Sequence, residues 1–155
     1  MNCVYVRNLR LGEGTPKVCI PLVGASDEAL FEEIKALSSY PADLVEWRTD
    51  YMNDIFNEGR LTGLLPRLRE HLGNTPLIFT FRTTKEGGQR QASPQQYKTL
   101  AMEAIASGCI DLIDIELFSD PDSITELTAL AKEKGVKTIF SSHDFYSTPS
   151  CGELL

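Results

Sequence analysis

The sequence predicts an α/β fold built on a parallel sheet, and three observations support this. Five apolar runs have the length and β-branched content of strands, and the stretches between them carry apolar residues at helical spacing. Strands and helices alternate strictly, which requires parallel strands with right-handed crossovers. The chain has 155 residues, 42% of them hydrophobic, which is enough for the core of one domain. We therefore expect one α/β domain over residues 1–155.

The elements follow one another at a nearly regular period. Residues 1–16 contain short extended pieces separated by glycines and Pro16, which predict a hairpin ahead of the main fold. The expected strands are residues 17–24, 43–48, 76–81, 110–117 and 136–140. The expected helices begin at Ser26, Gly59, Ser93 and Ser123, and residues 149–155 begin a fifth.

Several of these segments are apolar enough to predict burial. Residues 17–24 form a nearly continuous apolar run, as in a strand buried on both faces, although Pro21 is more usual at an edge or a bulge. The strand at 136–140 is also expected to be buried. Four cysteines lie far apart, mostly within apolar runs, and are Cys3, Cys19, Cys109 and Cys151. We expect buried thiols in a reducing compartment, without a disulfide or zinc role.

Two architectures contain strictly alternating strands and helices: an open doubly wound sheet and a closed eight-stranded barrel. The glycine-rich dinucleotide fingerprint is missing after the first strand, where only Gly24 is present, and no phosphate-binding loop pattern occurs. Polar residues recur instead at the carboxyl ends of successive strands, where barrel enzymes assemble their sites. We therefore expect a (β/α)8 barrel of the TIM type, of which about the first five β/α units are present.

The charge of the chain excludes some classes of partner. A formal net charge of -7 argues against a nucleic-acid or anionic-membrane surface, but allows a small anionic substrate in a local basic pocket. We find no secretory signal and no apolar stretch long enough to cross a bilayer, so we expect a cytoplasmic protein. No histidines, cysteines and acids have metal-ligand spacing, so we expect no metal.

Acidic and basic residues alternate near the ends of two strands. Glu46 and Arg48 are two residues apart, so their side chains share a face, which in a barrel is the lumen. Together they can bind hydroxyl and carboxylate groups of a polar ligand, and the alternative is a surface ion pair without function. Asp114 and Glu116 share a face in a very apolar strand, so we expect arginines of neighbouring strands to pair with them.

Two further strand ends carry candidate catalytic groups. Arg82 precedes a charged loop with two adjacent glycines, which either covers a site with Glu86 or is simply solvated. His143 follows the fifth strand beside a carboxylate, and the ordinary histidine pKa of about 6.5 suits proton transfer at neutral pH. The alternative for His143 is a hydrogen-bonded structural residue. We expect His71, on the second helix, to be a solvated helix residue.

Four of these segments, taken together, resemble type I 3-dehydroquinate dehydratase. They are E-W-R at 46–48, F-T-F-R-T-T-K-E-G-G at 79–88, D-I-E-L-F at 114–118 and S-S-H-D-F at 141–145. They occur in order, each at the end of a successive strand, and the resemblance extends over essentially all of the chain. It implies a lyase of the shikimate pathway, in aromatic amino acid biosynthesis, that converts 3-dehydroquinate to 3-dehydroshikimate through a Schiff base with a lysine. It also implies no metal and no dissociable cofactor.

The resemblance assigns roles to the candidate residues. His143 is then the general acid and base, Glu86 helps to orient it, and Glu46, Arg48 and Arg82 bind the substrate. The family's imine-forming lysine lies on the sixth strand, and none of the seven lysines of this chain matches it. The resemblance therefore implies the N-terminal five-eighths of a barrel, from which we expect no turnover, and open sheet edges from which we expect a homo-oligomer.

Three hypotheses stay open. In the first, the chain is a truncated part of a dehydratase. In the second, it is a catalytically inactive binding module that keeps the polyol-recognising half of the site. In the third, it is a different lyase or an aldolase-like barrel.

Overall fold

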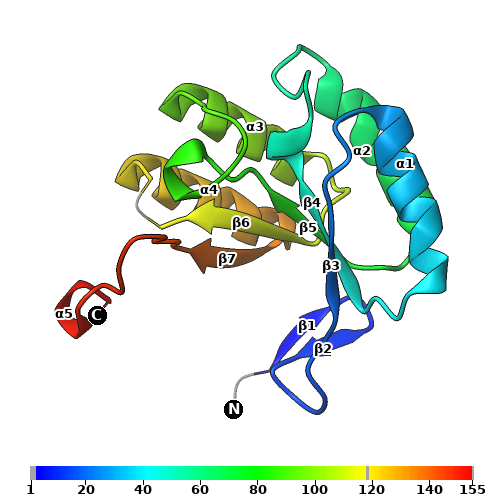
Figure 1. Cartoon of the computed structure of the whole chain (residues 1–155), viewed down its shortest axis with the longest axis horizontal. Coiled ribbons are helices and arrows are strands. Elements are labelled where there is room, and N and C mark those ends of the chain that lie inside the picture. Colours follow the sequence, from blue (N-terminus) through cyan, green and yellow to red (C-terminus); the bar gives the residue numbers. More distant parts are fainter. Residues whose placement is uncertain (1–2, 118, 155) are drawn as a thin grey trace.

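A short antiparallel hairpin precedes a five-stranded parallel sheet in the computed structural model, which describes residues 3–117 and 119–154 (Figure 1). The hairpin consists of β1 (Val4–Val6) and β2 (Leu9–Leu11). The strands of the sheet are β3 (Cys19–Leu22), β4 (Leu44–Arg48), β5 (Leu77–Thr80), β6 (Leu112–Glu116) and β7 (Lys137–Ser141). The helices are α1 (Asp27–Ala36), α2 (Arg60–Leu72), α3 (Pro94–Ala106), α4 (Pro121–Lys134) and α5 (Cys151–Leu154). Short 3-10 helices are η1 (Leu37–Ser39), η2 (Thr49–Tyr51) and η3 (Thr84–Glu86).

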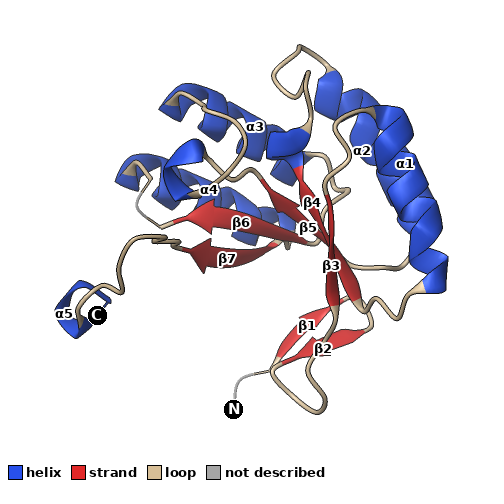
Figure 2. Ribbon diagram, in the orientation of Figure 1, coloured by secondary structure: helices blue, strands red, loops and turns tan. Residues whose placement is uncertain are grey.

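The order of the strands distinguishes between the two architectures. The strands lie side by side in sequence order, β3-β4-β5-β6-β7, and all four pairings are parallel. Figure 2 shows the helices α1 to α4 outside the sheet. A doubly wound sheet reverses its strand order and carries helices on both faces, whereas sequential order is that of a barrel. The predicted TIM-barrel type, with five strands present, is confirmed.

Polar side chains cap the starts of α1, α3 and α4, whereas α2 begins after Gly59 without a side-chain cap. The Ser26 hydroxyl accepts a hydrogen bond from the amide of Ala29 at the start of α1. Ser93 and Gln96 form a capping box at the start of α3. The predicted start of α4 at Ser123 is wrong by two residues, because the carboxylate of Asp120 accepts from the Ser123 amide at 2.9 Å and starts the helix at Pro121.

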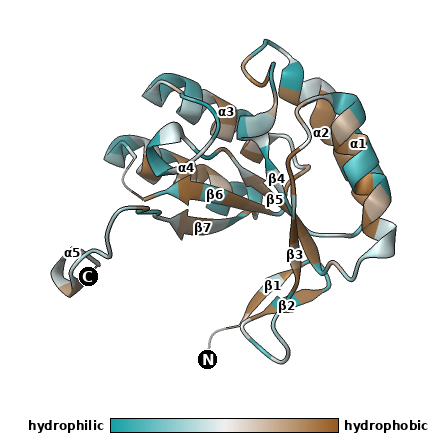
Figure 3. Ribbon diagram, in the orientation of Figure 1, coloured by the Kyte–Doolittle hydropathy of each residue, from teal (hydrophilic) through white to brown (hydrophobic). Residues whose placement is uncertain are grey.

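The hydrophobic core divides into two parts. The larger part lies between the sheet and the helices, and its largest fully buried side chains include Trp47 and Phe79. Figure 3 shows hydrophobic residues gathered on the sheet and on parts of the helices. A smaller cluster covers the amino-terminal end of the opposite face, where Val6 of the hairpin packs with Leu44, Ile78 and Leu112. The hairpin thus covers the end of the lumen face at which the strands begin.

The predicted burial of the first and last strands is wrong. Residues of β3 and β7 are mostly exposed or half-buried, and Phe140 of β7 is 48% exposed. Each of these strands is at an edge of the sheet and has a neighbour on one side only. The predicted burial of the cysteines is wrong as well, since Cys19 and Cys151 are exposed and the other two are half-buried. Pro21 does lie in an edge strand, as its chemistry favours.

Within the described residues, no helix has the length and apolar character needed to span a membrane.

Candidate active site

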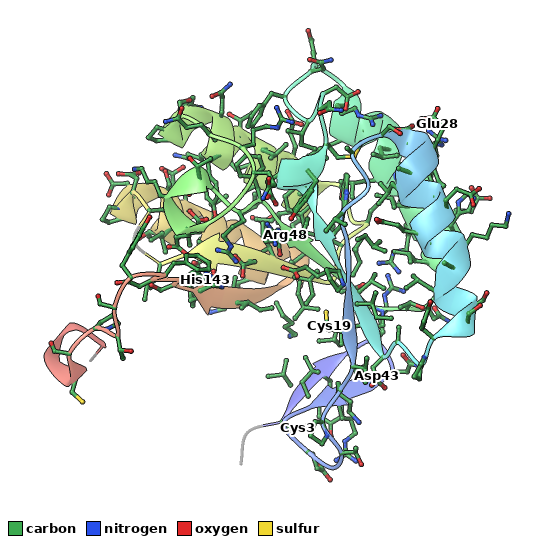
Figure 4. All side chains as sticks on the ribbon, viewed as in Figure 1. Cys3, Cys19, Glu28, Asp43, Arg48 and His143 are labelled. Carbon is green, nitrogen blue, oxygen red and sulfur yellow. The ribbon has the colours of Figure 1, made fainter. Side chains whose placement is uncertain are left out.

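The candidate residues gather on the lumen face of the sheet, where the strands end. Because side chains alternate along a strand, Glu46 and Arg48 lie on the face opposite to Trp47. The register pairs Arg48 with Thr80, and Glu116 with Ser141. Figure 4 shows Arg48 and His143 away from the hairpin, which lies near Cys3 and Cys19. The half of this face at the carboxyl ends of the strands is therefore polar, and we call it the polar half. The half at the amino-terminal ends is the small apolar cluster.

Arg82 is the centre of this polar half. It is only 6% exposed, and its Nη2 donates to Oδ1 of Asp114 at 2.9 Å. Its Nη1 donates to the Ser141 hydroxyl at 2.9 Å and lies 3.4 Å from a carboxylate oxygen of both Glu86 and Glu116. The prediction that an arginine on a neighbouring strand pairs with Asp114 and Glu116 is confirmed. One guanidinium therefore holds three buried carboxylates in fixed positions.

Glu116 also fastens the loop after β5. Its two carboxylate oxygens accept from the amide and the hydroxyl of Thr83, both at 2.8 Å. The backbone amide of Glu116 donates to the hydroxyl of Tyr97 at 3.1 Å. Burial, reinforced by the charges of Glu116 and Asp114, raises the pKa of Tyr97, so the phenol stays neutral at neutral pH.

Glu86 and His143 form a pair, as the sequence suggested. Oε2 of Glu86 lies 3.0 Å from Nδ1 of His143 and accepts from the His143 backbone amide at 3.1 Å. Glu86 is buried, whereas the His143 side chain is 43% exposed. A carboxylate at Nδ1 favours the tautomer with its proton on that nitrogen, which leaves Nε2 to exchange protons. The loop after β5 is therefore more than a solvated connection, because it carries a buried carboxylate to the histidine.

Arg48 pairs with Asp50, a residue that the sequence reasoning missed. Nε and Nη2 of Arg48 donate to the two carboxylate oxygens of Asp50, both at 2.8 Å. Asp50 is fully buried. Burial acts to raise the pKa of Asp50, but the hydrogen bonds from Arg48, Gln89 and Arg82 outweigh it and lower the pKa below its ordinary value. β4 ends at Arg48 and Asp50 lies in η2, so the alternation that places Glu46 and Arg48 on one face does not extend to Asp50.

Glu46 has no such partner. It shares the face of Arg48, as predicted, and its charge helps to raise the pKa of Arg48, but within residues 3–117 and 119–154 its side chain forms no hydrogen bond or close ion pair. It is half-buried, so its carboxylate remains available to a ligand on the lumen face.

Each of the two adjacent glycines of the loop is required for a steric reason of its own. A Cβ on Gly88 would lie 1.9 Å from the carbonyl oxygen of Arg82, where no side chain fits. Gly87 has a φ of +81° and a Cβ there would lie 2.4 Å from the ring of Phe145. Both glycines hold the loop close to the sheet and to the segment after β7.

A pocket of about 460 Å³ adjoins the site. Glu86 and His143 line it together with the loop before α3, residues 142–146 and Pro149, but Glu46, Arg48 and Arg82 do not. Much of its outer wall consists of exposed side chains, such as Tyr146 at 99% exposure. We therefore place the candidate active site on the polar half of the lumen face, which adjoins this pocket at His143 and Glu86.

His71 lies away from this site. It is exposed, as expected, but its Nδ1 is 2.8 Å from the carbonyl oxygen of Arg67 and its ring packs 4.7 Å from that of Phe31. Among the described residues, no group of three or more histidines, cysteines and acids is placed to hold a metal ion.

The match to a known family decides the classification. A family profile described as type I 3-dehydroquinase matches residues 18–155. The chain belongs to this family.

Curated members of the type I 3-dehydroquinase family match along the whole chain. It is 44% identical to the 3-dehydroquinate dehydratase of Clostridium novyi over 155 residues, which are 100% of this chain and 61% of the relative. It is 40% identical to the enzyme of Enterococcus faecalis over the same length, again 61% of the relative. The chain thus spans about 60% of the length of these relatives.

Solved structures agree with this type I 3-dehydroquinase fold. The type I 3-dehydroquinate dehydratase of Clostridium difficile, solved with covalently modified comenic acid, superposes with a TM-score of 0.94 at 38% identity. The match covers 99% of this chain and 60% of that structure. The enzyme of Enterococcus faecalis superposes with a TM-score of 0.92 at 40% identity, over 97% of this chain and 63% of that structure.

Proposed function

We propose that this chain carries the proton-transfer and polyol-binding part of a 3-dehydroquinate dehydratase site. The observation that carries the proposal is the pair of Glu86 and His143, with Nδ1 and Oε2 3.0 Å apart at the carboxyl end of a barrel-type sheet. Membership of the type I family supplies the reaction, the dehydration of 3-dehydroquinate to 3-dehydroshikimate in the shikimate pathway. We infer a cytoplasmic location from that biosynthetic role, and no dissociable cofactor or metal.

The proposed chemistry uses a lysine imine and one histidine. A lysine amine condenses with the substrate ketone and releases water, and the protonated imine acidifies the neighbouring carbon. His143 removes the proton from that carbon and returns a proton to the departing hydroxide. Glu86 keeps the imidazole ring in one orientation throughout, and the exposed part of the ring faces solvent and ligand.

Substrate binding falls to the polar half of the lumen face. The unpaired carboxylate of Glu46 can accept hydrogen bonds from substrate hydroxyl groups, and Arg48 can donate to a hydroxyl or a carboxylate. Arg82 is already bonded to Asp114, Ser141, Glu86 and Glu116. We propose that it contributes positive charge to the site while holding these acids in place.

We propose that none of the lysines of this chain forms the imine. Lys98 pairs with Glu126 and Lys134 with Glu133, while Lys85 is exposed on its loop. Lys137 lies in register with Leu112 at the amino-terminal start of β7, four residues from Ser141 and hence about 13 Å along the strand. The 155 residues alone are therefore proposed not to turn over 3-dehydroquinate.

Trapping with borohydride tests this proposal. The chain is incubated with 3-dehydroquinate and sodium borohydride, which reduces an imine to a stable amine, and is then examined by mass spectrometry. We expect no adduct on this chain, and an adduct of substrate mass on the full-length Clostridium novyi relative treated in parallel. An adduct on any lysine here would overturn the lysine assignment, and a Lys85→Arg variant would show whether Lys85 carries it.

A binding module without turnover is the second candidate function. Glu46 without a partner and Arg48, whose side chain is 21% exposed, favour it, because both are available to a ligand on this chain. Calorimetric titration with 3-dehydroquinate should show binding that is lost in Glu46→Gln and in Arg48→Met. Absence of binding to the unmodified chain would contradict both this candidate and the substrate assignment.

We further propose that residues 1–155 form one incomplete barrel domain, with residues 1–16 as the hairpin region at its base, and that this domain forms homo-oligomers. The edge strands β3 and β7 each have one unpaired side, and Phe140 on β7 is substantially exposed. Sedimentation velocity tests the assembly, and a single monomeric species at all concentrations would refute it.

A further inference from the structure

Asp50 is a buried carboxylate that the proposed chemistry does not use, yet it joins three segments of the site. It has no exposed surface. Its Oδ1 accepts from Nε of Arg48 at 2.8 Å and from the backbone amide of Arg82 at 3.4 Å. Its Oδ2 accepts from Nη2 of Arg48 at 2.8 Å and from the backbone amide of Gln89 at 3.0 Å. One side chain thus contacts the end of β4, the end of β5 and the loop between β5 and α3.

On the β4 side, Asp50 fixes the plane of a guanidinium. Two parallel hydrogen bonds between a carboxylate and an arginine leave little rotational freedom, and the Arg48 head also lies 5.1 Å from the centre of the Tyr51 ring. Both N–H groups of Nη1 and the second N–H of Nη2 have no hydrogen bond to any described residue, so these donors remain for a ligand. Asp50 therefore determines where Arg48 presents its free donors.

On the β5 side, Asp50 fastens both ends of the loop that carries Glu86. The amides of Arg82 and Gln89 flank this loop, and both point at the same carboxylate. Gly88 lies against the Arg82 carbonyl and its amide donates to the Thr83 carbonyl at 2.8 Å, so the two ends of the loop also contact each other directly. Glu86 lies within the loop and meets His143 at 3.0 Å.

We propose that Asp50 is a positioning residue that couples the orientation of Arg48 to that of the Glu86–His143 pair. A ligand that draws Arg48 toward itself then shifts the loop and the histidine through one shared carboxylate. The part of the proposal that concerns a ligand rests on the proposed function, whereas the coupling itself is a property of the ligand-free chain. The lowered pKa of Asp50 keeps it ionised, and so able to accept all four hydrogen bonds, at neutral pH.

The test compares Asp50→Asn with a matched control, Asp111→Asn. Asp111 accepts from Arg69 at 2.9 Å and from the Leu77 amide at 2.9 Å, so it is also a carboxylate with arginine and backbone partners, but at the opposite end of the sheet. Two-dimensional NMR follows the Arg48 Nε–H, the Glu86 and Gln89 amides and the His143 ring, and hydrogen exchange is measured at the Gln89 amide.

Asp50→Asn should shift all of these signals and accelerate exchange at Gln89 by about tenfold or more, while Asp111→Asn leaves them in place. Unchanged Glu86 and His143 signals in Asp50→Asn would overturn the coupling. Equal changes in both variants would overturn it too, because they would reflect general destabilisation.

Two further measurements keep the outcome decisive. If Asp50→Asn does not fold, the variant Arg48→Lys is used instead. It removes the paired hydrogen bonds between Arg48 and Asp50, while Asp50 keeps its hydrogen bonds to the loop. The coupling then requires a shift of the His143 ring signals in Arg48→Lys. No shift would refute it. Titration with 3-dehydroquinate should show affinity reduced about tenfold or more in Asp50→Asn. If the unmodified chain does not bind 3-dehydroquinate, the proposed function fails, and the ligand-free spectra still decide the coupling.

Discussion

The two faces of the sheet are made by alternate residues of the same strands, but they are stabilised in different ways. The face toward the helices is apolar, with Trp47 and Phe79 in edge-to-face contact at 5.7 Å. The lumen face carries the Arg82 cluster at the carboxyl ends of the strands and the small apolar cluster at their amino-terminal ends. Apolar packing stabilises without requiring one orientation, whereas a buried ion cluster contributes little net stability but fixes the direction of every group. Stability and positioning are thus separated by the pleat of the strands.

Removal of the Arg82 guanidinium should cause the largest loss of stability. Arg82→Met leaves three buried carboxylates without their guanidinium and should cost about 4–5 kcal/mol, as for other broken buried ion pairs. Urea denaturation followed by the fluorescence of Trp47, the one tryptophan, measures it. Arg67→Met, which removes an exposed ion pair to Asp27, is the control and should cost about 1 kcal/mol or less. Adding Asp114→Asn to Arg82→Met should restore part of the stability, and no restoration would contradict the cluster account.

A cavity in the core on the helix face should cause the second-largest loss of stability. Phe79→Ala should cost about 3–4 kcal/mol, because Phe79 is fully buried and packs on Trp47. Phe140→Ala changes the same residue type on the exposed edge strand β7 and should cost about 1 kcal/mol or less. Phe79→Ala should also leave the NMR signals of His143 unchanged, unlike Arg82→Met. Displacement of His143 by both variants would show that the two faces are not independent.

Asp50→Asn should have a smaller effect that depends on pH. Loss of hydrogen bonds to a charged group costs about 1.5–3 kcal/mol at pH 6 to 7. The pKa of Asp50 is lowered in the folded chain, so its stabilisation is present above the ordinary value of 3.8 and is lost as the pH falls through the folded pKa. The difference in unfolding free energy between the unmodified chain and Asp50→Asn should be constant from pH 5 to 7 and decrease below about pH 3.8. A difference that grows in acid would be inconsistent with a lowered pKa.

A substitution in the small apolar cluster of the lumen face should have the smallest effect on stability. Ile78 packs with Val6, Leu44 and Leu112. Ile78→Val should cost about 0.5–1.5 kcal/mol and leave the Arg82 cluster intact. Thermal or urea unfolding measures the loss, and unchanged His143 signals serve as the control. A loss of stability as large as that of Phe79→Ala would mean that the small cluster on the lumen face contributes as much to stability as the larger core on the helix face.

The sequence was sufficient for the order of elements and for much of the site, because both depend on local periodicity. Alternation along β6 placed Asp114 and Glu116 on one face, and the need of buried acids for cations pointed to Arg82. Their partners could be predicted because few cations are available to so apolar a strand.

The sequence was insufficient where the outcome depends on what lies beside an element. The runs that became β3 and β7 are apolar, but their exposure follows from their place at the sheet edges, which no local pattern encodes. The exposure of Cys19 on β3 has the same cause. Asp50 was missed because it lies beyond the end of β4, in η2, where the alternation of a strand no longer predicts the direction of a side chain.

Gly88 has a consequence for how this gene tolerates change. Any side chain there would overlap the Arg82 carbonyl, whereas a Cβ on Gly63 would meet nothing within 4 Å. A library of single codon changes, sorted for abundance of the protein, should therefore retain almost every replacement at codon 63 except proline and only glycine at codon 88. Codon 88 would then identify, by genetics alone, the point where the loop that carries Glu86 touches the sheet.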